Sequence, residues 1–421
     1  MRTCDVAIVG AGILGLATAR EVLRRDSRLR LVVLEKEREV AQHQTGHNSG
    51  VIHSGIFYTP GTLKGGLAGQ AGREVYAYCA EKGIPAERCG KVLVATHPAE
   101  LPNLDALYRS GVALGIEGLE LIGPERLAEL EPHCVGLRAL WSPNTGISNY
   151  GQIARALAAD IAALGGEVLV RHGVVDIAVR GDGVVLQTPA GEVGARHVIT
   201  CAGIQSDTLA RLTGAPREPH MLPFRGNYWT LRPERRHLAR NLIYPVPNPA
   251  LPFGDVHFIR QVDGSVLLGP NAVLAFARDG YERFHVNGRD LMATVSAPGF
   301  RKLAARHWRL GFWELARDLS KPMFVRSLQR FVPELRGDDL LPGPTGVAAF
   351  AVQRDGRPAS DFRFDVQAPH FIHARTAPTA TFGLALGRVL ADEALEAFGM
   401  TAGTAPVATV GSVVGDRRSS A

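Results

Sequence analysis

Three glycines near the start of the chain have the spacing of a cofactor-binding turn. An apolar run, residues 4–9, leads into Gly10-Ala11-Gly12-Ile13-Leu14-Gly15, and Glu35 ends the next apolar run. Gly10 permits the tight bend, Gly12 lets backbone approach a diphosphate, and Gly15 lets the following helix pack on the strand. Free N–H groups at the helix start attract the diphosphate, and the Glu35 carboxylate accepts hydrogen bonds from a ribose. The pattern predicts a dinucleotide cofactor rather than an ordinary glycine-rich turn.

The acidic residue narrows the choice of cofactor. A carboxylate at Glu35 argues against NADP, whose 2′-phosphate prefers a basic partner, but it does not separate NAD from FAD. A glycine- and histidine-rich stretch follows at residues 42–60. It is too long for a mere connection and too polar for a core, and loops of that length in compact domains tend to be functional.

Alternating strand and helix patterns position these residues and predict an α/β fold. After the first strand–helix–strand unit, we expect helices at residues 63–82, 101–114 and 124–130 and a strand near 92–95. From Tyr150 the pattern of a cofactor domain returns, and the strand at 195–202 ends in Cys201-Ala202-Gly203, a second place for backbone to approach a cofactor. Residues 216–340 are aromatic-rich and strand-forming, and a last helix begins near Leu384.

This order predicts a cofactor domain divided by two insertions of a substrate domain, an arrangement that NAD dehydrogenases rarely need. The expected segments are 1–82, 150–215 and 341–399 for the cofactor domain and 83–149 and 216–340 for the substrate domain, with a poorly ordered tail at 400–421.

Composition excludes several classes of protein. The chain has 421 residues, is 46% hydrophobic and carries a net charge of +6. Its arginines are scattered, which argues against a nucleic-acid-binding protein. The positive charge fits either a weak attraction to anionic lipids or substrates or an ordinary solvated surface. The longest apolar stretch is too short to span a bilayer, and no secretory pattern precedes it, so we expect a cytoplasmic protein without a transmembrane segment. The five cysteines show no disulfide or metal spacing, and we expect no metal.

A longer stretch resembles a known family. Leu34-Glu35-Lys36-Glu37, followed by the run from His43 to Ile56, is similar to the L-2-hydroxyglutarate dehydrogenase/oxidase family, within the D-amino-acid-oxidase-type FAD superfamily. The similarity resumes at 223–226, 242–247 and 256–276 and extends to about residue 399. It implies a Rossmann-like FAD-binding domain of the glutathione-reductase/D-amino-acid-oxidase type, an α+β substrate domain on a mixed β-sheet, noncovalent FAD, and oxidation of an L-2-hydroxy acid to the 2-oxo acid.

The resemblance also implies which residues contact FAD. Gly10, Gly12 and Gly15 would hold the diphosphate and Glu35 the ribose. The other contacts that the similarity implies are Ile13, Leu14, Lys36, Thr45, Gly46, Asn48, Ser49, Gly50, Val174, Val175, Cys201, Ala202, Gly203 and Thr381. For Lys36, a plain surface position is the main alternative.

Oxidation of an alcohol by a flavin requires a base for the hydroxyl proton, and a neutral histidine suits that task near pH 7. His53 is the first candidate because it lies in the loop expected to face the flavin. The equally weighted alternative is an imidazole that only hydrogen-bonds loop backbone. His257 is the second candidate, from a strand of the substrate domain, while His43 and His47 are expected to hold the loop together.

The candidates for substrate carboxylates are Arg225 and Arg260, with Tyr58 and Tyr244 as hydroxyl donors. Arg225 is preferred because it precedes a glycine in a strand motif. For Arg260, a surface ion pair is the favoured alternative.

Two C-terminal segments depart from the family pattern. Residues 346–350 read Gly-Val-Ala-Ala-Phe where the family usually has Gly-Val-Arg-Ala-Gln, and residues 374–381 differ as well. Loss of an arginine matters because guanidinium groups commonly hold carboxylates. The substrate can therefore differ from 2-hydroxyglutarate, unless Arg375 restores the charge.

Three functions follow from these residues. Oxidation of L-2-hydroxyglutarate or a related L-2-hydroxy acid is favoured. The alternatives are a flavin amine or amino-acid oxidase of the same superfamily, and a flavoprotein with a divergent substrate or without catalysis. Oxygen and a membrane quinone are both open as electron acceptors, and a peripheral contact with the inner face of a membrane is open too.

Overall fold

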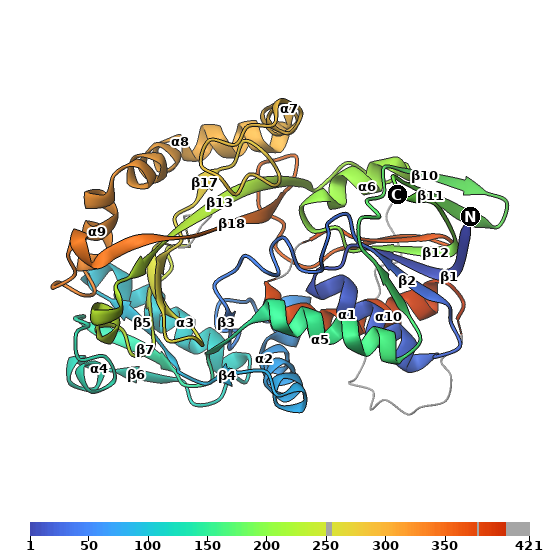
Figure 1. Ribbon diagram of the computed structural model, residues 1–421. Helices are drawn as coiled ribbons and strands as arrows, with labels where there is room; N and C mark the ends of the chain where they lie inside the picture. Colours follow the sequence, from blue (N-terminus) through green and yellow to red (C-terminus); the bar gives the residue numbers. More distant parts are fainter. Residues whose placement is uncertain (250–254, 377–378, 401–421) are drawn as a thin grey trace.

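The chain folds into two lobes, each built on one large β-sheet (Figure 1). The structure is a computed structural model and describes residues 1–249, 255–376 and 379–400. Of the tail expected at 400–421, all but Met400 lies outside the described residues. No helix in those ranges has both the length and the apolar content needed to cross a membrane.

The first sheet has a parallel centre in the order β20-β12-β1-β2-β9. Its apolar strands are buried on both faces, as parallel strands between two layers require. The central strands are β1 (Arg2–Val9), β2 (Leu31–Leu34), β9 (Glu167–Leu169), β12 (Gly191–Thr200) and β20 (Phe371–Ala374), and antiparallel strands β10 (Asp176–Arg180), β11 (Gly183–Thr188) and β19 (Phe364–Gln367) extend it.

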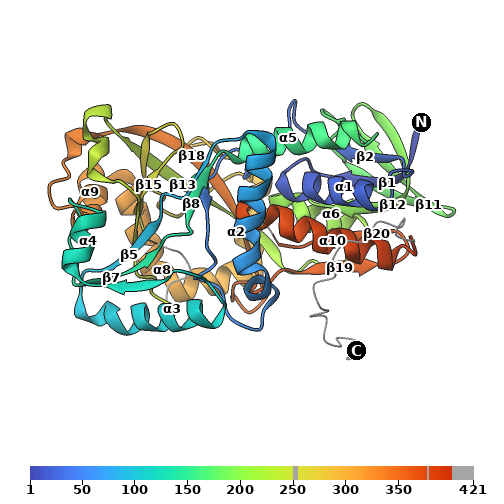
Figure 2. The ribbon, with the colours of Figure 1, turned by 90° about the horizontal axis from the view of Figure 1, so that it is seen from below.

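Helices cover one face of this sheet and meet through small residues (Figure 1). A Cβ on Gly387 would lie 2.6 Å from the Ala17 side chain, so glycine lets two helices approach closely. The helices are α1 (Ile13–Arg25), α5 (Tyr150–Ala163) and α10 (Gly383–Ala397), with α2 (Leu63–Lys82) between the lobes (Figure 2) and α6 (Ser206–Leu212) on the opposite face.

The second sheet is mixed and has the order β17-β13-β16-β15-β14-β5-β7-β6, with β18 on the other side of β13. Its strands are β5 (Lys91–Ala95), β6 (Glu120–Ile122), β7 (Arg138–Ser142), β13 (His220–Leu231), β14 (Leu242–Pro245), β15 (His257–Arg260), β16 (Val266–Gly269), β17 (Val273–Leu274) and β18 (Leu340–Val352). Helices α3 (Leu101–Ala113) and α4 (Pro124–Leu130) flank it, and β3 (Val51–Ile52), β4 (Ala86–Glu87) and β8 (Gly146–Ser148) form a small third sheet.

The predicted α/β class, with a mixed sheet in the second lobe, is confirmed. Strands of the first sheet come from residues 2–34, 167–200 and 364–374. The exact boundaries of the domain segments remain a prediction. At the start of the expected last cofactor segment, residues 340–352 pair with β13 of the second sheet rather than with the first sheet.

The strand-forming interpretation of residues 216–340 is correct for residues 220–274 and wrong for residues 288–329. This region also contains three helices, α7 (Gly288–Ser296), α8 (Pro298–Leu319) and α9 (Lys321–Gln329). Beyond a kink at His307, the aromatic residues of α8 face solvent while Glu314, Arg317 and Asp318 are buried, so this half does not turn the usual apolar face to the core.

Candidate cofactor and active site

A cavity of about 530 Å³ opens where parallel strands of the first sheet end. Its wall includes Gly10 after β1, Glu35 after β2, Cys201 after β12, and Ala374, the last residue of β20. Open α/β sheets bind their ligands at the carboxyl ends of the strands. The position therefore fits a cofactor site assembled from three distant stretches of the chain.

The glycines leave room that no side chain could share. Gly10 has a φ of +110°, and a Cβ there would lie 2.5 Å from the Cys201 carbonyl oxygen. A Cβ on Gly15 would lie 2.0 Å from the Gly10 carbonyl oxygen. Gly12 precedes the first turn of α1, whose free N–H groups suit a diphosphate, and the Ile13 N–H donates to the Thr45 hydroxyl at 3.0 Å.

Glu35 is fixed by backbone hydrogen bonds. Its Oε2 accepts from the Ala11 N–H at 2.8 Å and its Oε1 from the Glu37 N–H at 3.0 Å. The side chain is buried at the cavity wall. Since each carboxylate oxygen can accept a second bond, the group remains able to receive the hydroxyls of a ribose.

We expect Glu35→Gln to weaken FAD binding about tenfold, because an amide offers one acceptor oxygen and turns an NH₂ toward a backbone donor. Titration of FAD into flavin-stripped protein measures the change. Glu39→Gln, a neighbouring exposed carboxylate, serves as the control and should bind FAD as the parent does. Equal affinity for the parent and the Glu35 variant would contradict this role.

Most of the predicted cofactor residues lie along the cavity. Those that line it are Gly10, Gly12, Ile13, Leu14, Glu35, Lys36, Thr45, Val174, Val175, Cys201, Ala202 and Gly203. The cavity is also lined by residues that no sequence motif marks, among them Arg171, His172 and Arg278.

The remaining predicted cofactor residues lie outside this lining. Gly15 is at the strand–helix contact, while the Asn48 side chain donates to two backbone carbonyls and accepts from the Gly50 N–H, which shapes the loop. The Ser49 carbonyl accepts from the Gln261 side chain of the second lobe. A Cβ on Gly46 would lie 2.3 Å from a carbonyl oxygen, and Thr381 accepts from the His53 N–H at 3.1 Å.

A second cluster joins the histidine loop to the second sheet. The His53 and Phe57 ring centroids are 6.3 Å apart, and Lys91 Nζ lies 4.3 Å from the Phe57 ring and 5.1 Å from the Tyr244 ring. Tyr244 in turn stacks on His257 with 3.7 Å between centroids. None of these five residues lines the cofactor cavity.

Two polar atoms of this cluster have no protein partner. Lys91 is fully buried and its Nζ makes no hydrogen bond within the described part of the chain, where no carboxylate pairs with it either. His53 as a residue is half-buried, and its Nδ1 is buried and has no partner in the described part of the chain either. A buried ammonium without a counterion is costly, so this cluster is suited to an anion that brings its own acceptor atoms.

Burial also sets the protonation of the cluster. Desolvation, with the nearby Lys91 and His257, lowers the pKa of His53 to about 3, and desolvation lowers that of His257 to about 4. The His257 Nδ1 lies 2.8 Å from the Asp255 carbonyl oxygen, so this nitrogen carries the proton. Burial lowers the pKa of Lys91 to about 7. Both imidazoles are therefore neutral at pH 7.

No sequence motif marks Lys91. It sits at the start of the otherwise apolar strand β5, Lys-Val-Leu-Val-Ala, of which every residue is buried. A lysine is almost never fully buried without a partner. A single lysine in such a run was the available signal, and only the pairing of β5 with β14 brings it beside Tyr244.

The predicted arginines are engaged elsewhere. Arg225 donates to the carbonyls of Glu282 and Arg283 and lies 3.6 Å from Asp318. Arg260 pairs with Glu87 at 2.8 Å, as the surface alternative expected. These arginines are held by partners within the fold, and the structure does not bring them to the His53 cluster.

Arg375 is fully buried and pairs with Asp365 at 2.6 Å, so it does not replace an arginine at residues 346–350. In that segment Ala348 is exposed, and Phe350 packs against Phe224. The Tyr58 hydroxyl lies 3.4 Å from that of Thr379. Of the predicted substrate contacts, only Tyr244 lies in the His53 cluster.

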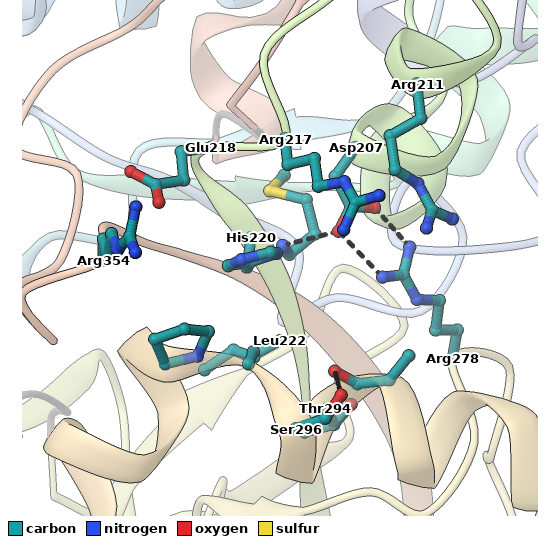
Figure 3. A pocket seen from close by; sticks show the side chains of 14 residues that line it. Asp207, Arg211, Arg217, Glu218, His220, Leu222, Arg278, Thr294, Ser296 and Arg354 are labelled. Carbon is teal, nitrogen blue, oxygen red and sulfur yellow. Dashed lines mark hydrogen bonds and ion pairs between the residues drawn. The ribbon is translucent and has the colours of Figure 1, made fainter.

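A further pocket, of about 350 Å³, lies between α6, the start of β13 and the end of α7 (Figure 3). Arg278 spans both pockets but is paired with Asp207 at 2.5 and 2.9 Å. His220 lines it, and burial is the first cause that lowers the pKa of this imidazole. The pocket holds no residue predicted for catalysis or cofactor binding.

Nothing in the described ranges indicates a metal centre. No group of three or more His, Cys, Asp or Glu side chains is placed there to hold an ion, and all five cysteines are free and buried.

The fold and the cavity define a flavin-dependent oxidoreductase. A family model described as FAD dependent oxidoreductase matches residues 5–393. Among solved structures, the FAD-bound L-α-glycerophosphate oxidase of Mycoplasma pneumoniae aligns with a TM-score of 0.76 at 21% identity and 97% coverage of both chains. Glycine oxidase of Geobacillus kaustophilus aligns with a TM-score of 0.68 at 17% identity, covering 96% of this chain and 100% of that one. The chain is an enzyme of this FAD-dependent family.

Sequence relatives give a finer assignment. Enzymes named L-2-hydroxyglutarate dehydrogenase match from Nematostella vectensis (44% identity, 94% of this chain, 91% of the relative), Homo sapiens (42%, 94% and 89%) and Escherichia coli (40%, 91% and 91%). The chain belongs with the L-2-hydroxyglutarate dehydrogenases inside the larger family. The predicted resemblance and the predicted FAD are confirmed.

Proposed function

We propose that this protein oxidises L-2-hydroxyglutarate, or a closely related L-2-hydroxy dicarboxylate, to the 2-oxo acid. The relatives that carry this name match over nearly the whole chain. The observation that carries the proposal is the presence, in one cluster, of the neutral imidazole of His53 and of the buried Lys91 ammonium, which has no hydrogen-bond partner in the described part of the chain. A 2-hydroxy acid needs both a base for its hydroxyl and a cation for its carboxylate.

The cofactor residues are part of the same proposal. The glycine turn and the start of α1 would hold the diphosphate of FAD, Glu35 its ribose, and Val174 or Val175 its adenine side. The cavity at the ends of β1, β2 and β12 and the room left by Gly10 support this assignment. The histidine loop supports it too, since Thr45 lines that cavity and His53 reaches the second cluster.

FAD, held by the glycine turn and Glu35, would supply the acceptor for the hydride from C2 of the substrate. His53 takes the proton of the 2-hydroxyl, and Lys91 pairs with a substrate carboxylate. His257 donates its Nδ1–H to the Asp255 carbonyl oxygen, so its Nε2 is a hydrogen-bond acceptor, and its ring stacks on Tyr244. The aromatic walls at Phe57 and Tyr244 limit water around the reacting groups.

The negative charge of the substrate would favour the roles proposed for His53 and Lys91. An opposite charge nearby favours the protonated form, so a bound carboxylate raises the pKa of His53 and of Lys91 above their values in the free protein. His53 thereby becomes a stronger base, and Lys91 stays charged. The site is thus best matched to an anionic substrate.

The amino-acid oxidase alternative is less compatible with this cluster. An amino acid carries an α-ammonium, which would approach the Lys91 ammonium and be repelled by it. The oxidases and deaminases among the structural neighbours are below 25% identity and support the fold alone. A divergent acid remains the second candidate, because residues 346–350 offer no cation.

A steady-state comparison with an artificial electron acceptor tests the proposal. We expect kcat/KM for L-2-hydroxyglutarate to exceed that for L-lactate, which lacks the second carboxylate, by at least about tenfold, the value of one charge-assisted hydrogen bond. The D enantiomer and a matched amino acid, L-glutamate, should give no turnover. Turnover of L-glutamate but not of the hydroxy acid would refute the proposal.

We propose that the electron acceptor is either oxygen or a membrane quinone. We also propose that the protein is cytoplasmic and contacts a membrane peripherally. The animal relatives are named as mitochondrial enzymes. Activity assays with oxygen and with a soluble quinone distinguish the acceptors.

A further inference from the structure

Helix α8 presents its apolar side to solvent. Trp308, Phe312, Leu315 and Leu319 follow one another at the i, i+4, i+7, i+11 spacing of a single helical face, beyond a kink at His307. Trp308 is 55% exposed, Phe312 66% and Leu319 60%. Trp313 beside them is also exposed. We call these five residues the aromatic stripe. Helix α8 lies on the outer side of the second lobe, where α7 and α8 cover the sheet (Figure 1).

The opposite side of the same helix is held to the protein by charges. Glu314 accepts from the Ala272 N–H at 3.0 Å, and Arg317 pairs with Glu314 and with Asp255. Asp318 accepts from the Asn271 amide at 2.6 Å.

Asp318 also pairs with Arg225 at 3.6 Å and with Arg283 at 3.2 Å. This explains the buried position of Arg225. Beyond His307, α8 buries Glu314, Arg317 and Asp318 and exposes its aromatic residues, the reverse of the usual pattern for a helix on a protein surface. Since exposed apolar patches mark interaction sites, the aromatic stripe is a candidate docking surface.

The exposed charged residues of α8 are all positive. Lys302, Arg306 and Arg309 of α8 are exposed and have no acidic partner among the residues that the structure describes, and Arg309 lies over the Trp308 ring at 5.3 Å. The two acids of α8, Glu314 and Asp318, are both buried on the inner side. The accessible face of α8 is therefore aromatic and cationic without an exposed carboxylate.

We propose that the aromatic stripe of α8, with Lys302, Arg306 and Arg309, docks on an anionic phospholipid surface. Helices with Trp, Phe and Leu on one side and Lys or Arg beside them lie in the lipid interface, with the apolar side among the acyl chains and the cations at the headgroups. A second copy of the chain fits less well, because a two-fold contact through the same face sets the cations against one another. This proposal goes beyond the reaction and does not depend on its substrate.

Vesicle sedimentation with the holoenzyme tests the proposal. We expect binding to vesicles that contain phosphatidylglycerol, weak binding to pure phosphatidylcholine, and weaker binding as salt rises. Trp308→Ser combined with Phe312→Ser should reduce binding at least about tenfold, and Lys302→Glu combined with Arg306→Glu should reduce it similarly on anionic vesicles only.

Matched variants exclude trivial effects. Val112→Ser on α3 removes an equally exposed apolar residue, and Arg180→Glu on β10 reverses an exposed arginine far from α8; both should bind as the parent does. All variants should keep their FAD content and their rate of flavin reduction. Absence of binding by the parent, or equal loss in the Val112 and Arg180 variants, would overturn the proposal. Dimerisation of the parent that the Trp308 and Phe312 changes abolish, with no lipid binding, would overturn it in favour of a second copy.

Discussion

His53→Ala is expected to slow anaerobic reduction of the bound flavin by L-2-hydroxyglutarate about 10²–10⁴-fold, the usual contribution of a positioned general base. FAD content should stay at the parent level, because the imidazole does not line the cofactor cavity and its link to Thr381 is made by backbone N–H. Rapid-mixing absorbance of the flavin measures the rate, and absorbance of the purified protein measures the content.

His373→Ala is the matched control for this variant. His373 is also a buried imidazole whose pKa is lowered to about 4 by desolvation, but its ring nitrogens contact Thr200 and Thr213. Its loss should reduce stability without a comparable effect on the reduction rate per bound flavin. If His53→Ala instead loses FAD in proportion to activity, the imidazole has a structural role in the loop, and the base must be sought elsewhere.

Lys91→Met is expected to change activity and stability in opposite directions. The variant should lose about tenfold to a hundredfold in kcat/KM for L-2-hydroxyglutarate, mainly through KM, because a carboxylate loses its cation. It should also unfold at a higher temperature. Holding an unpaired ammonium in this aromatic site lowers its pKa from 10.5 to about 7, which costs the folded state about 3–5 kcal/mol at pH 7.

The lowered pKa of Lys91 also determines how stability and activity depend on pH. Between about pH 7 and 10.5 the unfolded chain binds the Lys91 proton and the folded chain does not, so parent stability rises with pH in that range. This component of the rise should be absent in Lys91→Met. The parent kcat/KM should fall above about pH 7 as Lys91 loses its charge, whereas the variant should lack that fall.

Lys302→Met, a change at an exposed lysine, is the control and should leave KM, stability and the pH profile at parent values. Lys91→Met with an unchanged KM would contradict the assignment of Lys91 to the substrate carboxylate.

Local patterns predicted the cofactor half of the molecule well. The α2 helix has the predicted bounds, Leu63–Lys82, because the signals at its ends are local: the Thr62 side chain caps the first turn, and Gly83 ends the helix in the left-handed conformation. The cavity forms at Gly10 and Glu35 for the same reason, since a turn and the strand beside it are close in sequence.

The substrate side depends on contacts between distant residues. Lys91 and Tyr244 are separated by most of the second lobe in sequence and meet only because β5 pairs with β14. Arg225 and Arg260 have the right chemistry for a carboxylate, but Asp318 and Glu87, which no local pattern connects to them, pair with them instead. Helix α8 was missed for a similar reason. It buries Glu314 and Asp318, whereas a surface helix is recognised by charged residues on its exposed face.

Anaerobic mixing of the purified protein with L-2-hydroxyglutarate is the sharpest test of the proposed oxidation. We expect the protein to purify with FAD, the visible absorbance of the flavin to bleach with the L enantiomer and not with the D enantiomer, and one 2-oxoglutarate to form per flavin reduced. A flavin that stays oxidised with L-2-hydroxyglutarate while an amino acid bleaches it would refute the proposed reaction.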